Sequence, residues 1–320
     1  MMQFQAFGKT ELEVSPLCLG TMQFGWTADE AASFEVLDAF VEAGGNFIDT
    51  ADVYSHWVPG HKGGESEDII GRWLRARNNR DRLVVATKAR GKMWDGADGE
   101  GLSRSHLMRA VDDSLRRLQV ETIDLYQTHY PDLGTPIEET LRAFEEMVTS
   151  GKVRYIGLSN YASMHMEEAL RVAGEASLPR AVALQPHYNL VHRDEYEGAL
   201  EAVCRRDGIA VIPYSPLAAG FLTGKYRAGR PLPKSQRQNR AKEHMTEQGM
   251  AVLAALDSVA AAHSTTTPAV ALAWLLAKPA IAAPIIGANS VAQLADLLPA
   301  AELRLSAGEV ASLDEVSAGL

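Results

Sequence analysis

The sequence is poor in cysteine, with only Cys18 and Cys204, which lie far apart in the chain. It has no CxxC pair, so the cysteine motifs of zinc sites and disulfide frameworks are missing. Cys18 falls inside the apolar run Leu17-Cys-Leu19, where a thiol normally just packs. This scarcity favours a reducing compartment, and we expect a cytoplasmic protein.

Positive charge is also scarce: 31 Lys and Arg face 41 Asp and Glu, a net charge of −10. A large basic surface is therefore not expected, nor is a nucleic-acid partner. The longest apolar stretch, 268–277, is stopped by Lys278 and is too short to cross a bilayer. The first ten residues lack the apolar core of a signal peptide, so we expect no membrane or targeting segment. Two histidine pairs, His56 with His61 and His187 with His192, do not have zinc spacing, and no metal is expected.

Short apolar runs alternate with helical patterns through the chain, giving eight strand-then-helix units. Alternation of this kind predicts a parallel sheet, and eight units predict a closed barrel. We expect a single α/β domain over residues 1–320, a (β/α)8 TIM barrel with an N-terminal β-hairpin around the turn at Gly8. Thr27 and Ser306 each begin a capping box and should start helices. An open doubly wound sheet is the alternative, but the turn Gly20-Thr-Met-Gln-Phe-Gly25 is not the GxGxxG that it would need.

Reactive side chains stand where successive strands end: Asp49, Lys88 and His129, with Tyr54 just beyond the first. The carboxyl ends of barrel strands share one face, so these groups should converge. A cation roughly 4 Å from a phenol, at an effective dielectric of about 20, favours phenolate by about 4 kcal/mol. Lys88 can supply that cation, Asp49 can keep it charged, and His129 can bond a substrate oxygen. Each residue alone has an ordinary structural explanation, but the set indicates a catalytic site.

The chain resembles the aldo-keto reductases in a series of ordered motifs covering nearly its whole length. The matching segments are Gly45-Asn-Phe-Ile-Asp49-Thr-Ala-Asp-Val-Tyr54, Ala86-Thr-Lys88, Leu125-Tyr-Gln-Thr-His129, Ile156-Gly-Leu-Ser-Asn160, Gln185, Tyr188-Asn189 and Pro213-Tyr-Ser-Pro-Leu217. The resemblance implies hydride transfer between a nicotinamide and an aldehyde or ketone. Tyr54 would then be the proton donor, Lys88 and Asp49 would tune it, and His129 would orient the carbonyl. The chain is also similar to the β subunits of potassium channels, a branch of the same family.

The resemblance also implies a cofactor site for NADPH, with NADH possible but weaker. Tyr214 would stack on the nicotinamide, Ser159, Asn160 and Gln185 would bond its carboxamide, and a basic loop after Gly220 would cover the phosphates. That loop contains Lys225, Arg227, Arg230, Lys234, Arg237, Arg240 and Lys242. Many relatives carry Arg where Asn289 stands and Asn where Leu297 stands, so this chain departs from them at the adenosine end. The full expected cofactor set is Gly20, Thr21, Met22, Asp49, Ser159, Asn160, Gln185, Tyr214, Ser215, Leu217, Gly220, Lys225, Gly287, Asn289 and Gln293.

Aromatic residues in the loops after the first four strands, Trp26, Trp57, Trp94 and Tyr130, are expected to bind a small carbonyl substrate. Two other functions fit the same motifs. One is a cofactor-binding regulatory protein, as in the channel subunits, and the other is a Schiff-base aldolase with Lys88 as nucleophile. The Asp49 partner disfavours the aldolase because it favours the charged amine. No pattern in the sequence indicates an oligomeric state.

Overall fold

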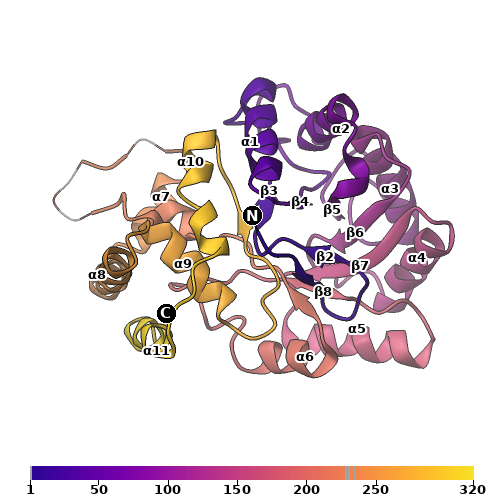
Figure 1. Ribbon diagram of the computed structural model, residues 1–320. Helices are drawn as coiled ribbons and strands as arrows, with labels where there is room; N and C mark the ends of the chain where they lie inside the picture. Colours follow the sequence, from indigo (N-terminus) through magenta and orange to yellow (C-terminus); the bar gives the residue numbers. More distant parts are fainter. Residues whose placement is uncertain (1, 228, 230, 234) are drawn as a thin grey trace.

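The computed structural model describes residues 2–227, 229, 231–233 and 235–320. Its centre is a parallel sheet whose strands follow the order β10-β3-β4-β5-β6-β7-β8-β9, with helices around it (Figure 1). The strands are β3 (Cys18–Gly20), β4 (Phe47–Asp49), β5 (Val84–Ala89), β6 (Ile123–Thr128), β7 (Val153–Ser159), β8 (Ala183–Gln185), β9 (Ala210–Val211) and β10 (Ile285–Ile286).

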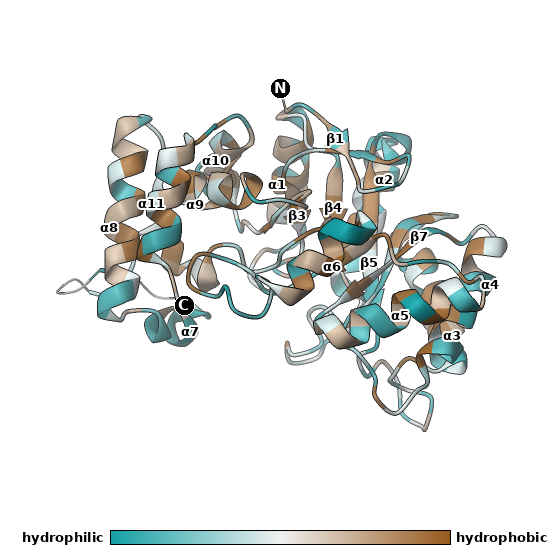
Figure 2. Cartoon of the chain, turned by 90° about the horizontal axis from the view of Figure 1, so that it is seen from below, coloured by the Kyte–Doolittle hydropathy of each residue, from teal (hydrophilic) through white to brown (hydrophobic). Residues whose placement is uncertain are grey.

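Helices follow the strands on the outside. They are α1 (Glu30–Glu42), α2 (Glu65–Arg77), α3 (Arg104–Leu118), α4 (Ile137–Thr149), α5 (Ser163–Glu175), α6 (Ala199–Asp207), α7 (Gln238–Glu243), α8 (Glu247–Ala262), α9 (Thr267–Leu276), α10 (Val291–Ala295) and α11 (Ala307–Val316), with 3-10 turns η1 (Arg80–Arg82), η2 (Ala218–Thr223) and η3 (Leu298–Ala301). Figure 2 shows brown, hydrophobic residues along many of these helices. The parallel sheet with helices around it confirms the predicted barrel class.

The ring closes between its first and last strands through the segment before β10. Val211 bridges Ile281, the Ala282 amide donates to the Val211 carbonyl at 2.8 Å, and the Ile285 amide donates to the Pro213 carbonyl at 2.9 Å. β10 then pairs with β3 in parallel register. Closure leaves the carboxyl ends of all the strands on one face.

The predicted N-terminal hairpin is present as β1 (Gln5–Ala6) and β2 (Glu13–Val14), paired antiparallel. It brings Phe7 and Val14 against the amino-terminal ends of the strands, and both are fully buried. Phe7 meets Phe47 of β4 edge to face, with ring centroids 5.4 Å apart. The hairpin thus closes the amino-terminal end of the barrel with apolar side chains, and the polar strand ends lie at the opposite, carboxyl-terminal end.

One helix start differs from the sequence prediction. The N-cap of α1 is Asp29, whose carboxylate accepts from the Ala32 amide at 2.9 Å, and not Thr27. Residues 23–28 form a compact turn, with the Ala28 amide bonded to the Gln23 carbonyl, so helical geometry begins later. The Thr27 hydroxyl instead donates to Asn289. The capping box at Ser306 and Glu309 is confirmed at α11.

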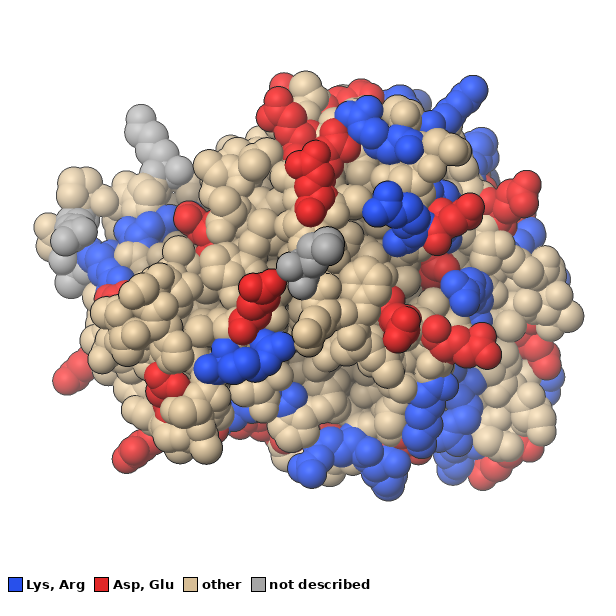
Figure 3. All heavy atoms as spheres, viewed as in Figure 1, with Lys and Arg blue, Asp and Glu red and all other residues tan. Residues whose placement is uncertain are grey.

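Within the described residues, no single helix is long and apolar enough to cross a membrane. α8 and α9 reach that threshold only as a pair, and they are bent 95° from each other. On the face drawn in Figure 3, acidic and basic side chains lie interspersed.

Candidate active site

The ammonium of Lys88 joins two other side chains at the carboxyl ends of β4 and β5. It donates to Oδ2 of Asp49 at 2.6 Å, to the Thr50 carbonyl at 2.7 Å and to the Tyr54 hydroxyl at 3.1 Å. Lys88 has no exposed side-chain surface. A buried amine with three acceptors has all its protons used, so its position is fixed. The phenol of Tyr54 is therefore held against a cation.

Asp49 is held by two amides that the sequence did not single out for this purpose. Gln185 and Gln127 donate from Nε2 to Asp49 Oδ1, at 2.9 and 3.2 Å. Gln127 lies beside Lys88 in the β5–β6 register, so both side chains face the barrel interior. It also occupies the space over Gly157, where an added Cβ would come within 3.0 Å of its Cγ. The two-residue periodicity of Gln127 and His129 was the available signal for this role.

Burial and charge set the protonation of these groups. Burial raises the pKa of Tyr54, and the opposing charge of Lys88 does not cancel it. The sequence predicted that Lys88 would favour the phenolate and so lower the pKa of Tyr54; in this structure burial raises that pKa instead. Burial alone would lower the pKa of Lys88, but the charges of Asp49 and Tyr54 outweigh it and raise that pKa. At neutral pH Tyr54 is a neutral phenol beside a permanently charged ammonium.

His129 stands across from Tyr54, with ring centroids 5.8 Å apart, and stacks on Tyr130 at 5.2 Å. Burial, followed by the charges of Lys88 and Arg90, lowers the pKa of His129 to about 3. The imidazole is therefore neutral over the physiological range and can both donate and accept one hydrogen bond.

A cleft of about 1660 Å³ opens over these residues. Tyr54 and His129 lie in its lining, and so do Trp26 and Tyr130. Trp57 packs edge to face against both Trp26 (5.4 Å) and Tyr54 (6.4 Å). The reactive phenol therefore lies among aromatic rings.

A family comparison identifies the class of protein. The model of the "Aldo/keto reductase family" matches residues 16–318. The chain belongs to the aldo/keto reductase family. Members of this family are oxidoreductases that act on small-molecule carbonyl compounds and generally use NAD(P)H.

Curated relatives agree over almost the full length. "Uncharacterized oxidoreductase YrpG" of Bacillus subtilis (strain 168) is 36% identical over 99% of this chain and 97% of its own. "L-glyceraldehyde 3-phosphate reductase" of Escherichia coli (strain K12) is 32% identical over 98% of this chain and 92% of its own. "Probable voltage-gated potassium channel subunit beta" of Arabidopsis thaliana is 30% identical over 94% of this chain and 92% of its own. The chain is thus similar both to reductases and to the channel-subunit branch.

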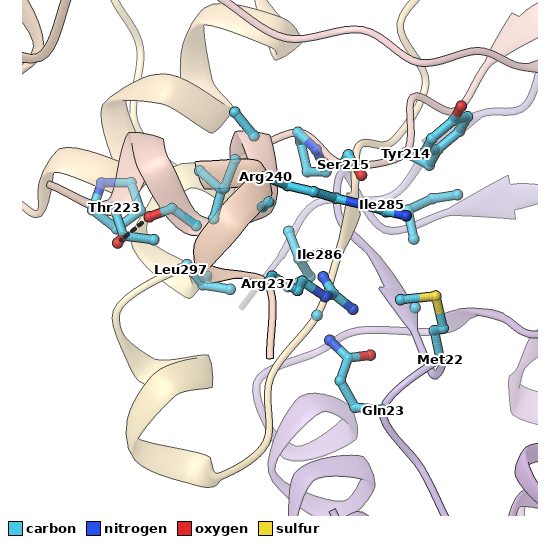
Figure 4. A pocket seen from close by; sticks show the side chains of 18 of the residues that line it. Met22, Gln23, Tyr214, Ser215, Thr223, Arg237, Arg240, Ile285, Ile286 and Leu297 are labelled. Carbon is cyan, nitrogen blue, oxygen red and sulfur yellow. Dashed lines mark hydrogen bonds between the residues drawn. The ribbon is translucent and has the colours of Figure 1, made fainter. Parts of the chain in front are cut away.

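The cleft suits the family's dinucleotide first through its charge. Lys225, Arg237 and Arg240 line it, and none has an ion-pair partner among the described residues. Figure 4 shows the Arg237 and Arg240 side chains extending into the cavity near Ile285 and Ile286. Burial lowers the pKa of Lys225, and the charge of Arg237 lowers it further. Burial also lowers the pKa of Arg237, and the charge of Arg240 acts in the same direction. Phosphate groups would relieve this repulsion.

Other members of the expected basic loop lie elsewhere. Arg227 pairs with Asp257 at 2.8 Å, and Lys242 is not in the lining of the cleft. Arg230 and Lys234 fall outside the described residues.

Tyr214 and its neighbours form the polar wall next to Tyr54. The Tyr214 hydroxyl donates to Asn160 Oδ1 at 2.8 Å, and Asn160 Nδ2 donates to the His129 carbonyl at 2.9 Å. Asn160 and Ser215 have left-handed backbone, with φ of 61° and 51°. Left-handed backbone is uncommon for a serine, so the surrounding structure fixes Ser215 beside Tyr214. Nε2 of Gln185 already donates to Asp49 Oδ1, so a nicotinamide carboxamide would contact Oε1 of Gln185.

Fourteen of the fifteen residues expected at the cofactor line this one cleft, and Thr21 is the exception. Thr21 is fully buried; its hydroxyl donates to the Asp49 carbonyl at 3.1 Å and accepts from Ser66 at 2.8 Å. Thr21 therefore stabilises the carboxyl end of β4 without lining the cleft. At the far end of the cleft, Asn289 accepts from Thr27 at 2.6 Å, and its amide donates to Gln293 Oε1 at 2.9 Å.

The structure does not bring Trp94 to the cleft. Trp94 stacks on His106 at 4.8 Å, and the Arg109 guanidinium lies 4.0 Å from its ring. The β5–α3 loop folds back on α3 and carries this indole with it. Of the four aromatic residues expected at the substrate, Trp26 and Tyr130 line the cleft, whereas Trp57 and Trp94 do not. Trp57 packs behind the lining, against Trp26 and Tyr54.

Sequence reasoning also missed a buried ionic cluster behind the site. Glu67 of α2 bonds Arg117 of α3 and the Thr87 hydroxyl, each at 2.6 Å. Asp52 is fully buried beside them, and neither carboxylate oxygen has a hydrogen-bond partner among the described residues. Burial, then the charge of Glu67, raises the pKa of Asp52 well above its usual range. Burial therefore favours the neutral form of Asp52 within the loop that carries Tyr54.

Proposed function

We propose that this protein reduces aldehyde or ketone carbonyls to alcohols, with NADPH as the preferred reductant. The observation that carries the proposal is the contact of one buried ammonium, Lys88, with both Asp49 and the Tyr54 hydroxyl at the floor of the cleft. A bound nicotinamide would supply the hydride. The remaining chemistry is the delivery of one proton and the stabilisation of a developing alkoxide.

Tyr54 is the proton donor in this scheme. Its raised pKa keeps the proton on the phenol until the carbonyl oxygen becomes basic. As the proton leaves, the phenolate forms 3.1 Å from Lys88 Nζ, which stabilises it without moving. Asp49 keeps Lys88 charged. The neutral His129 donates a hydrogen bond to the same substrate oxygen and orients it.

The cofactor would be held by the cations Lys225, Arg237 and Arg240 at its phosphates and by Tyr214 at its nicotinamide. Lys225, Arg237 and Arg240 have no acidic partner within the ranges that the structure describes, and three such cations favour the more highly charged dinucleotide, which supports NADPH over NADH. We propose that NADH still binds, because Asn289 offers the adenosine end only a neutral amide.

Two other functions are less well supported. A Schiff-base aldolase needs Lys88 as a neutral nucleophile, whereas Asp49 and Tyr54 raise its pKa. A regulatory protein would bind the nucleotide without turning over aldehydes. We also propose that residues 1–320 form one functional unit, and that the two free, buried cysteines reflect a cytoplasmic setting.

The test is Tyr54→Phe, which removes only the hydroxyl. NADPH oxidation with a panel of aldehydes, ketones and sugars should fall by at least about a hundredfold, the usual size of a general-acid contribution. NADPH quenching of tryptophan fluorescence should be unchanged, which separates lost chemistry from lost binding. Turnover within a few-fold of the wild-type value would refute Tyr54 as the donor. Binding with no turnover of any carbonyl by the wild type would favour the regulatory function.

A further inference from the structure

Two histidines stack face to face on the side of Tyr214 and belong to the same cleft. The ring centroids of His187 and His192 are 3.8 Å apart, and those of His187 and Tyr214 are 5.1 Å apart, with an interplanar angle of only 11°. All three residues line the cleft. Because the imidazoles face each other, their nitrogens do not converge as metal ligands would, and no group of three metal-ligating side chains occurs in the described part of the chain.

The backbone holds this stack in place. His187 extends the β8–β9 pairing by a parallel bridge to Tyr214, and the Tyr214 amide donates to the Pro186 carbonyl at 3.0 Å. Asn189 ties the loop to the Ser215 carbonyl at 3.0 Å. From Tyr214 the contacts continue through Asn160 to the His129 carbonyl. The stack is therefore fixed relative to the catalytic centre.

The charged groups around the stack come from several segments. His192 Nε2 lies 3.3 Å from Glu195 Oε2. Burial, then the charge of His192, lowers the pKa of His187 to about 4, while Arg240 and His244 add smaller effects of the same sign. Burial also lowers the pKa of His244. Tyr54, Tyr130 and Arg240 face Tyr214, and Glu243 faces His244.

We propose that the stacked pair His187 and His192 makes the nicotinamide site sensitive to pH, so that acid weakens binding of the oxidised cofactor more than that of the reduced one. The inference rests on the proposed function, in which Tyr214 stacks on the nicotinamide. An oxidised nicotinamide ring is cationic and a reduced one is neutral. A proton taken up by the imidazole pair therefore opposes only the oxidised form.

The direction and size of the effect follow from electrostatics. With two or three stacked rings between the charges, at roughly 10 Å and an effective dielectric of about 20–40, one added charge changes affinity about four- to sixteenfold. Protonation of the nucleotide's own phosphate, near pH 6, is common to both cofactor forms and cancels in the ratio of their dissociation constants. The ratio for NADP+ over NADPH should therefore rise as pH falls.

The experiment measures both dissociation constants by tryptophan fluorescence or calorimetry from about pH 8 to about pH 4, a range that reaches the lowered pKa of His187. The variants His187→Phe and His192→Phe keep a ring in the stack but cannot gain a proton. His165→Phe, on α5 and outside the cleft lining, is the matched control. The wild type and the control should show the rise, and each stack variant should flatten it. Both histidines are half-buried, and the His192 variant tests the inference even if His187→Phe is unstable.

Each outcome decides the matter. A flat ratio in the wild type, or a slope that both stack variants preserve, would overturn the inference and leave the reductase function intact. A preserved slope would point to His244 instead. If neither nucleotide bound at any pH, the proposed function itself would fail and this inference with it.

Discussion

The Lys88 ammonium lies 2.6 Å from the Asp49 carboxylate, and neither side chain has more than 2% of its surface exposed. A buried pair of this kind is costly to break, because removal of one partner strands the other charge in a medium of low dielectric. The same ammonium contacts Tyr54, so one ion pair serves both folding and the proposed chemistry. These two contributions can be separated experimentally.

Lys88→Met should abolish carbonyl reduction and lower the free energy of unfolding by about 3–5 kcal/mol, the usual cost of a stranded buried charge. The two glutamines on Asp49 will limit that cost. Adding Asn at Asp49 removes the stranded charge, so the double variant should regain most of the stability and none of the activity. Lys152→Met, which breaks an exposed pair with Asp112, should change stability by no more than about 1 kcal/mol. Denaturant unfolding and NADPH oxidation measure the two quantities, and activity in the double variant would contradict the scheme.

Asp52 gives a prediction about stability and pH. Folding raises the pKa of Asp52, so the neutral acid contributes to the free energy of unfolding. This contribution is fully present below the unfolded pKa of about 4 and is lost as pH rises through the folded pKa. Asp52→Asn mimics the neutral acid and should therefore make the protein more stable than the wild type at neutral and alkaline pH, with the gain vanishing near pH 4. Thermal unfolding across that range checks the slope.

Asp38→Asn is the control of opposite sign. The Arg77 hydrogen bonds lower the pKa of Asp38, so its contribution is present above the unfolded value and is lost as pH falls. This variant should be less stable than the wild type at neutral pH. Equal behaviour of the two variants would show that Asp52 is ionised in the folded protein.

Sequence predicted the barrel and its reactive face because both depend on order along the chain. Asp49, Lys88 and His129 follow apolar strands, and parallel pairing alone brings them to one face. The protonation of Tyr54 was not predictable in the same way, because it depends on how completely neighbouring segments exclude water. The position of Trp94 depended on where a long loop turned, and the residues of that loop give no periodic signal.

The contact of Thr27 with Asn289 shows another limit of sequence reasoning. The two residues are 262 positions apart and meet only because the barrel closes between β3 and β10. The capping motif takes only neighbouring residues into account, and it predicted Thr27 as the start of a helix. The stack of His187 on Tyr214 is of the same kind, since a spacing of histidines cannot show which ring they face.

The two tryptophans provide a matched test of the substrate wall. Trp26→Ala should raise KM for aromatic aldehydes about three- to tenfold, the size of one lost aromatic contact, because Trp26 lines the cleft, while kcat changes little. Trp94→Ala should leave KM unchanged, because its ring packs on His106 away from the cleft. Steady-state kinetics with one aromatic and one small aliphatic aldehyde distinguish the two. A larger effect from Trp94 would mean that its loop moves over the substrate.

Asn289 provides the test of cofactor choice. The wild type should prefer NADPH to NADH by roughly ten- to a hundredfold, because a charged hydrogen bond contributes about 1.5–3 kcal/mol and the cleft keeps at least one. Asn289 lies at the far end of the cleft and is held by Thr27 and Gln293, so a longer side chain there would start from an ordered backbone. Asn289→Arg should tighten NADPH and leave NADH nearly unchanged, because only NADPH carries the extra phosphate. Asn289→Ala controls for loss of the Thr27 contact without added charge and should weaken both slightly. Dissociation constants for both cofactors at one salt concentration decide the matter, and tighter NADH binding by the wild type would show that Lys225, Arg237 and Arg240 do not select the phosphate.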